Sequence, residues 1–175
     1  VEIDASDAAA ATTKLLGAQP DALLLGLVGK PSLDVIKDVN LARKGLQMYG
    51  PSPLASASNI KALGQDAVGL IVSQVMPFPQ NMSVPVVREY QQAMKAAGFN
   101  DFTHLSLEGY IDAKVATEGL RRAGKDLTRE SLIKAMQSIQ SYDVGGLEIS
   151  FNKGAGSASK FVELTVINSQ GKLVK

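Results

Sequence analysis

The sequence predicts an α/β fold built on an open parallel β-sheet, and features of the N-terminal part of the chain support this prediction. Residues 22–25 are an unbroken apolar run, which is typical of a strand buried on both faces of a parallel sheet. Gly26, Gly29 and Pro31 end the run, and Ser32 is placed to cap a following helix. Because the order of strand, glycine-containing loop and helix then recurs, one parallel sheet with right-handed crossovers is the simplest topology.

The other elements before residue 76 follow from local patterns. Residues 1–4 are expected to be the end of a strand, and Ser6 is placed to cap a helix that Gly17 ends. Further strands are expected at 46–49 and 68–75. The helix after the first loop, at about 33–43, has its apolar residues spaced for one inward face: Val35, Ile36, Val39 and Ala42. A short helix to about Leu63 is expected after the second loop, with Ser52 as its cap and Pro53 as its first residue.

The pattern changes after residue 75. Residues 76–83 are proline-rich and predict an extended segment. Three helices follow with no strand between them, at 85–97, 105–123 and, after the cap Thr128, 129–139. Strands return at 147–151 and 161–167, and a hairpin turn at 168–171 leads into 172–174. An α/β region, an all-helical region and a return to strands together predict two lobes.

Composition and motifs exclude several classes of protein. The chain has 175 residues, 45% apolar and 20% charged, with a net charge of +1, so nucleic-acid binding has no support from charge. It has no cysteine and a single histidine, His104, so a histidine triad or a cysteine metal site cannot be assembled. Leu24 and Pro31 break the phosphate-loop pattern, and no G-x-S-x-G elbow of a hydrolase is present. We therefore expect a protein that is not an enzyme and has no cofactor or metal.

Motifs along the whole chain carry a resemblance to a known family. They include Pro20–Ala22, Gln74–Pro79 and Pro85–Tyr90, the block from Ser106 to Lys114 that continues to Gly124, and the segments Asp143–Phe151 and Phe161–Val166. In this order they resemble the type I periplasmic solute-binding proteins of ABC importers, in the branch of the leucine/isoleucine/valine-binding protein. Such proteins are about twice as long, so the resemblance implies a truncated chain that corresponds to the C-terminal half.

The resemblance implies how the lobes are divided. Residues 1–75 and 144–175 would form the second, parallel-sheet lobe, and residues 79–140 would be the helical part of an incomplete first lobe. The segments 75–79 and 140–146 would be hinges about which the lobes close on a ligand, as in a Venus flytrap. The helices of the first lobe would then need a cover, either a missing N-terminal segment or another copy of the chain. Their inward residues would be Val87, Tyr90, Met94, Leu120, Leu132, Ile133 and Met136.

Two loops are the candidate ligand site. Loops 26–32 and 50–54 both follow parallel strands, so both are expected at the same edge of the sheet, each before a helix N-terminus that favours a carboxylate or amide. The resemblance implies an aromatic residue in the first loop and an acid in the second to pair with a ligand ammonium group, but Gly29 and Ser52 stand there. A carboxylate or neutral ligand is thus at least as plausible as an α-amino acid. The candidate ligand-binding residues are Val28, Gly29, Lys30, Pro51, Ser52, Met76 and Phe78, of which the last two have packing between the lobes as the alternative role.

The resemblance implies a binding function in an ABC import system, such as amino acid transport. The expected partners are a small-molecule ligand, the membrane permease of an ABC importer, and the missing N-terminal lobe or another copy of the chain. The expected location is periplasmic, or extracytoplasmic with a lipid anchor. The alternative function is a ligand-sensing regulatory module on the same fold, which a kinase or DNA-binding domain fused in the full-length gene would indicate.

Overall fold

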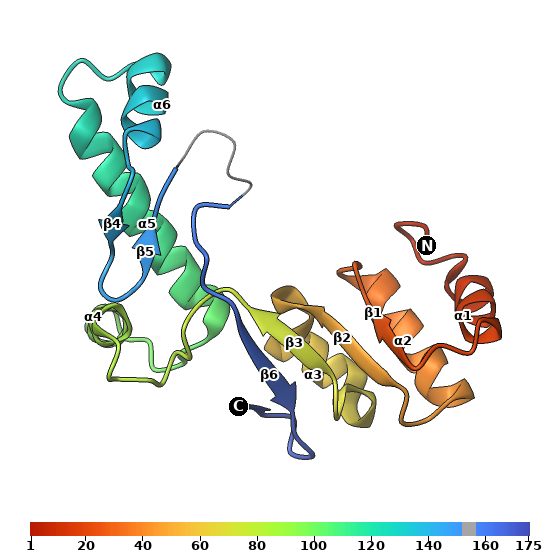
Figure 1. Ribbon diagram of the computed structural model, residues 1–175. Helices are drawn as coiled ribbons and strands as arrows, with labels where there is room; N and C mark the ends of the chain where they lie inside the picture. Colours follow the sequence, from red (N-terminus) through yellow and green to blue (C-terminus); the bar gives the residue numbers. More distant parts are fainter. Residues whose placement is uncertain (152–156) are drawn as a thin grey trace. The chain divides into compact units, whose positions relative to one another are not determined.

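The computed structural model describes residues 1–151 and 157–175 (Figure 1). The chain divides into two compact units. Unit 1 comprises Val1–Gln74 and Glu163–Lys175, and unit 2 comprises Val75–Val162. The chain therefore passes between the units at residues 74–75 and 162–163, whereas the sequence analysis places the second connection at 140–146. Residues 152–156, which the sequence analysis assigns to the second lobe, lie outside the described residues.

Unit 1 is built on a five-stranded sheet in the order β1-β2-β3-β6-β7. Strands β1, β2 and β3 are parallel to one another, and β6 and β7 are antiparallel to their neighbours. The predicted parallel sheet and the predicted C-terminal hairpin are both confirmed. The strands are β1 (Ala22–Leu24), β2 (Gln47–Pro51), β3 (Ile71–Gln74), β6 (Glu163–Ile167) and β7 (Leu173–Val174).

Helices cover one face of this sheet. In Figure 1, α2 and α3 lie behind the strands, and no helix of unit 1 lies in front of them. The helical segments are α1 (Ala8–Gly17), α2 (Lys30–Ala42), η1 (Ser52–Ala55), α3 (Ala57–Leu63) and η2 (Gly64–Ala67). Val35, Ile36 and Val39 of α2 are fully buried against Leu23, Met48 and Val72 of the strands, as the sequence predicts. Ala42, predicted to face inward, is exposed.

Several predictions about element ends in unit 1 are wrong. Residues 1–4 form no strand. Strand β1 is not buried on both faces, because Leu23 packs in the core with the helices while Leu24, on the other face, is 85% exposed. The cap of α2 is Gly29, and Ser32 lies inside the helix, where its Oγ donates to the Gly29 carbonyl at 2.7 Å. The caps assigned to Ser6 and Ser52 are also displaced, to Asp7 for α1 and to Ser56 for α3.

Unit 2 contains three helices and a short β-hairpin. The elements are α4 (Pro85–Ala96), α5 (His104–Ala123), α6 (Arg129–Gln137), β4 (Tyr142–Asp143) and β5 (Glu148–Ile149), with β4 and β5 antiparallel. Thr103 and Thr128 begin α5 and α6 with capping boxes, in which each threonine exchanges hydrogen bonds with the serine three residues later. The predicted cap Thr128 is thus confirmed, and these boxes fix the start of both helices.

The hairpin of unit 2 covers the helices. Val86, Val87, Tyr90, Leu107 and Ile111 are at most 1% exposed. They form one core with Val144, Leu147 and Ile149 from the hairpin region and with Met76. The prediction that Val87 and Tyr90 need a cover from outside this chain is therefore wrong, because residues 144–149 of the same chain cover them. Leu120 and Ile133 do remain exposed, at 43% and 48%.

Candidate functional site

The two candidate loops lie side by side at one edge of the unit 1 sheet. Strands β1 and β2 are parallel neighbours, with Leu24 paired to Tyr49. The pairing continues past β1, since the Leu25 amide donates to the Tyr49 carbonyl at 2.8 Å. The carboxyl ends of both strands therefore meet, and the loops that follow them open at the same edge.

Gly29 shapes the first loop. It is the N-cap of α2 with φ 69° and ψ −152°, a backbone conformation that is essentially restricted to glycine. No side chain of the N-cap satisfies the first amides of α2, and a Cβ built on Gly29 would meet no atom within 4 Å. The exposed residues Val28 and Gly29 therefore border open space at the positive end of a helix dipole.

Lys30 supplies the charge of this loop. Its Nζ lies 2.6 Å from the Asp34 carboxylate and donates to the Asp4 carbonyl at 3.2 Å, so the side chain is held on both sides. The side chain is nevertheless 66% exposed. The Ser6 amide, and to a smaller extent Lys30, lower the pKa of the Asp4 carboxyl. The i,i+4 spacing could have predicted the Lys30–Asp34 pair, but no pattern in the sequence indicates Asp4.

The second loop is tightly packed. Pro51 ends β2 and Ser52 begins the η1 turn, and both are half-buried. The preceding Gly50 is required by close packing, because a Cβ there would lie 2.3 Å from Cδ1 of the fully buried Leu54. Close packing of Gly50 on Leu54 therefore restricts the backbone just before Ser52.

Met76 and Phe78 belong to unit 2, where each has a definite packing role. Met76 is 7% exposed and is part of the helical core. The half-buried Phe78 ring packs edge-on against the His104 ring, with centroids 5.4 Å apart. Both contacts lie within unit 2, so packing between the lobes and ligand contact by either residue both stay predictions.

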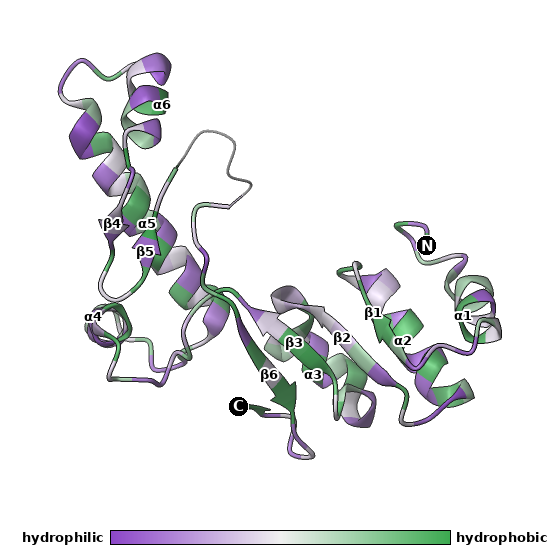
Figure 2. Ribbon diagram, viewed as in Figure 1, coloured by the Kyte–Doolittle hydropathy of each residue, from purple (hydrophilic) through white to green (hydrophobic). Residues whose placement is uncertain are grey.

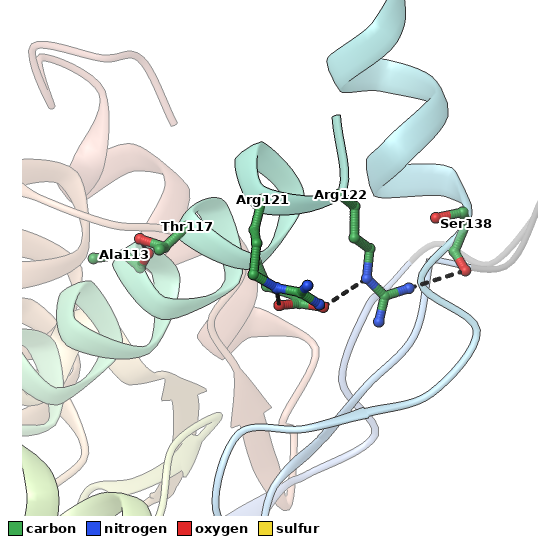
Figure 3. Close-up of polar contacts among 6 residues, drawn as sticks. Ala113, Thr117, Arg121, Arg122 and Ser138 are labelled. Atoms are coloured by element: carbon green, nitrogen blue, oxygen red, sulfur yellow. Dashed lines mark hydrogen bonds and ion pairs between the residues drawn. The ribbon is translucent and has the colours of Figure 1, made fainter. Parts of the chain in front are cut away.

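An ion-pair cluster joins α5 to the segment after α6. The Glu118 carboxylate accepts from Arg121 at 2.8 and 2.9 Å and from Arg122 at 2.6 Å, and Arg122 donates to the Ser138 carbonyl at 3.4 Å (Figure 3). Hydrogen bonds from Arg121 and Arg122 lower the pKa of Glu118 to about 2. A carboxyl that is ionised so easily lacks the raised pKa of a general acid, so the cluster is a structural link.

A groove of about 810 Å³ lies between α1 and the C-terminal half of α2. Its walls include Thr12, Leu16, Asp38, Leu41 and Arg43. Because the candidate loops lie at the N-terminal end of α2, this groove is a separate feature.

The described residues offer no cluster of three histidine, aspartate or glutamate side chains that could bind a metal ion. None of the helices in residues 1–151 and 157–175 is both long and apolar enough to span a membrane.

Comparison with solved structures supports the fold. The chain is 30% identical to a substrate-binding periplasmic protein from Ralstonia solanacearum, with a TM-score of 0.77 over 97% of this chain and 49% of that one. A branched-chain amino acid ABC transporter protein from Thermus thermophilus with bound valine matches at 18% identity and a TM-score of 0.70, covering 94% of this chain and 47% of that one. A fatty acid ABC transporter substrate-binding protein from Thermomonospora curvata matches at 19% identity and a TM-score of 0.69, covering 95% and 45%. The two matches below 25% identity show the fold alone.

The chain spans about half the length of the solved structures that it matches. No curated protein sequence matches it. The family model described as periplasmic binding protein matches residues 1–172, nearly the whole chain. The chain therefore belongs to the periplasmic binding protein family.

Proposed function

We propose that this chain is part of the solute-binding component of an ABC import system and delivers a small molecule to a membrane permease. The family membership of nearly the whole chain is the observation that carries this proposal. The protein binds its solute without transforming it and works in the periplasm, or outside the cytoplasm on a lipid anchor. Unit 1 contributes one wall of the ligand site, made by Val28, Gly29, Lys30, Pro51 and Ser52.

The ligand in this proposal is a small carboxylate or amide. Lys30 is the one charged residue in loops 26–32 and 50–54, and α2 begins beside it with its positive dipole end. Ser52 provides no negative charge that could pair with an ammonium group. Valine, which is bound in the Thermus thermophilus protein, carries an ammonium group. A fatty acid, for which the Thermomonospora curvata protein is named, does not. The charges of the two loops favour a carboxylate without an ammonium group.

Phe78, which is half-buried, and Met76, in the core of unit 2, are the other candidate ligand-binding residues in this proposal.

The proposal is tested on the full-length protein by titration calorimetry with a matched ligand set. Valine, isovalerate and isovaleramide share one branched chain and differ in the ammonium and carboxylate groups. We expect the tightest binding for isovalerate, and a loss of about tenfold or more for Lys30→Gln, because a charge-assisted hydrogen bond contributes about 1.5–3 kcal/mol. Lys61→Gln, an exposed lysine on α3, is the control and should bind as the parent protein does.

Ser52→Leu is a second variant for the same titration. It should weaken binding of all three ligands while changing the melting temperature little, since the Ser52 side chain is only half-buried. A bulky residue at Gly29 does not serve this purpose, because the backbone there would be strained in any variant. Unaltered affinity in both Lys30→Gln and Ser52→Leu would refute the assignment of the site to these loops.

A further inference from the structure

Lys30 is held at the first turn of α2 by two acceptors from different parts of unit 1. Strand β1, which is apolar throughout, leads into the loop that ends at this lysine (Figure 2). The Lys30 Nζ donates to the Asp34 carboxylate at 2.6 Å and to the Asp4 carbonyl at 3.2 Å. A lysine ammonium group has three N–H donors. Within the part of the chain that the structure describes, these contacts occupy two of the donors and leave one for a ligand.

The Lys30–Asp34 pair is placed against the helix dipole. Lys30 is the first residue of α2, where the positive end of the dipole repels a cation, and the first turn contains no acid. The order of the pair is also the less favourable one, because an acid that precedes a base at i,i+4 stabilises a helix more than the reverse order does. A pair that served only to stabilise α2 would have the acid first. Such departures from local rules are expected at functional positions, so the pair indicates a role in the loop that it borders.

We propose that Asp34 is a positioning residue that sets how strongly Lys30 prefers a carboxylate over an amide. This inference rests on the proposed function, because it concerns the same ligand site. Without a partner, the helix dipole would favour Lys30 conformations that lead away from the start of α2. The Asp34 carboxylate and the Asp4 carbonyl instead hold the ammonium group beside loop 26–32.

Two carboxylates also offset the charge of Lys30. The half-buried Asp34 carboxylate contacts the ammonium group directly. The Asp4 carboxylate is close as well, since Lys30 contributes, after the hydrogen bonds from Ser6, to lowering the pKa of Asp4. A ligand carboxylate therefore meets an ammonium group whose charge is already partly compensated, whereas an amide oxygen needs only the remaining N–H. Asp34 thus narrows the difference in affinity between the two kinds of ligand.

Titration calorimetry on the full-length protein with isovalerate and isovaleramide tests this inference. The measured quantity is the ratio of the two dissociation constants. Asp34→Asn keeps an oxygen acceptor for Lys30 and removes the charge. We expect it to shift the ratio about threefold to fivefold in favour of isovalerate, the range expected for an exposed ion pair. Asp34→Glu, which retains the charge, should keep the ratio of the parent protein.

Two controls separate direct contact from a general effect of charge. Asp38→Asn removes the same charge from the same helix, but it lies eight residues from Lys30, about 12 Å along the helix axis. This is more than the Debye length of about 8 Å at 0.15 M salt, so the ratio should change less than twofold. In the Lys30→Gln background, Asp34→Asn should leave the ratio unchanged, because Asp34 acts through Lys30.

Different results would overturn the inference and the proposed function. If Lys30→Gln weakens isovalerate binding but Asp34→Asn leaves the ratio unchanged, the role of Asp34 is refuted and the binding site stands. The same holds if Asp38→Asn shifts the ratio as much, or if Asp34→Asn weakens both ligands equally, which would be a structural effect on α2. If the parent protein binds neither ligand, or if Lys30→Gln has no effect, the proposed ligand site is refuted and this inference with it.

Discussion

The two units treat their apolar surface in opposite ways. In unit 2, the helices are closed by the hairpin β4–β5, and side chains such as Tyr90 and Ile111 are at most 1% exposed. In unit 1, helices cover one face of the sheet only, and Leu24 is 85% exposed. The sequence pattern suggests the reverse, a self-sufficient sheet and uncovered helices. A cover therefore need not come from a nearby regular element, and 144–149 provide it from a turn and two short strands.

The two units also differ in the contacts that hold them together. The hairpin of unit 2 is held on α4 by backbone contacts, since the Val86 amide donates to the Gly145 carbonyl at 2.9 Å. The Gly145 and Gly146 amides in turn donate to the Asp143 carboxylate. Unit 1 has a backbone ladder across five strands, and an exposed side chain on it such as Leu24 contributes little to folding. Substitutions should therefore matter most in the core of unit 2 and least at exposed sheet positions such as Leu24.

The largest expected difference in the free energy of unfolding is between two variants in which an apolar side chain is truncated. Ile111→Ala removes a side chain that is 1% exposed and leaves a cavity in the unit 2 core, so we expect a loss of about 2–5 kcal/mol in the free energy of unfolding. Leu24→Ala removes an 85% exposed side chain and should cost less than about 0.5 kcal/mol. Urea unfolding followed by circular dichroism measures both.

Equal losses in the two variants would show that the sheet face that carries Leu24 is covered in solution as well as the core is. That result would remove the contrast between the units.

Local sequence patterns predicted the parts of the fold that depend on short-range physics. The apolar spacing of Val35, Ile36 and Val39, the cap Thr128 and the hairpin turn at 168–171 are all confirmed. The three cap predictions fail for one reason: the sequence pattern assigns Ser6, Ser32 and Ser52, whereas the backbone begins α1, α2 and α3 after Asp7, Gly29 and Ser56. A cap depends on φ and ψ, which residue type alone does not determine.

The candidate site was predictable to the level of its loops. Gly26, Gly29 and Pro31 indicated a turn at a strand end, and the pairing of β1 with β2 brings both loops to one edge. What could not be predicted is long-range: Asp4 contacts Lys30 across 26 residues of sequence. The exposure of Leu24 could not be predicted for a related reason, since an apolar run such as 22–25 looks the same whether one or both of its faces are covered.

A smaller difference in stability is expected between the alanine variants of two glycines with positive φ. Gly145 has φ 116°, and a Cβ there would lie 2.9 Å from the Val86 amide nitrogen. Gly29 has φ 69°, but its Cβ would meet no atom within 4 Å. Both alanine variants incur backbone strain of about 1–3 kcal/mol, and Gly145→Ala should lose more because the hairpin must also move away from α4. Thermal unfolding of the two variants measures the order. A larger loss for Gly29→Ala would mean that the hairpin is not fixed on α4 as described.

The smallest effect concerns acid, which should loosen unit 2 through Glu118. Its folded-state pKa of about 2 lies below the usual value of 4.5, so the ion pairs with Arg121 and Arg122 add stability that is fully present above about pH 4.5. That contribution is lost as the pH falls from 4.5 toward 2, when the carboxyl is protonated in the folded chain as well.

Glu118→Gln removes the charge at every pH, so the difference in melting temperature between the parent chain and this variant should shrink over the same window. Because the carboxylate is near the surface, the difference should also fall in high salt. Glu130→Gln, at the exposed start of α6, is the control and should leave the acid dependence of the parent chain in place. A difference between parent and Glu118→Gln that stays constant from pH 6 to about pH 2 would show that Glu118 contributes through packing, and that the link from α5 to Ser138 does not depend on its charge.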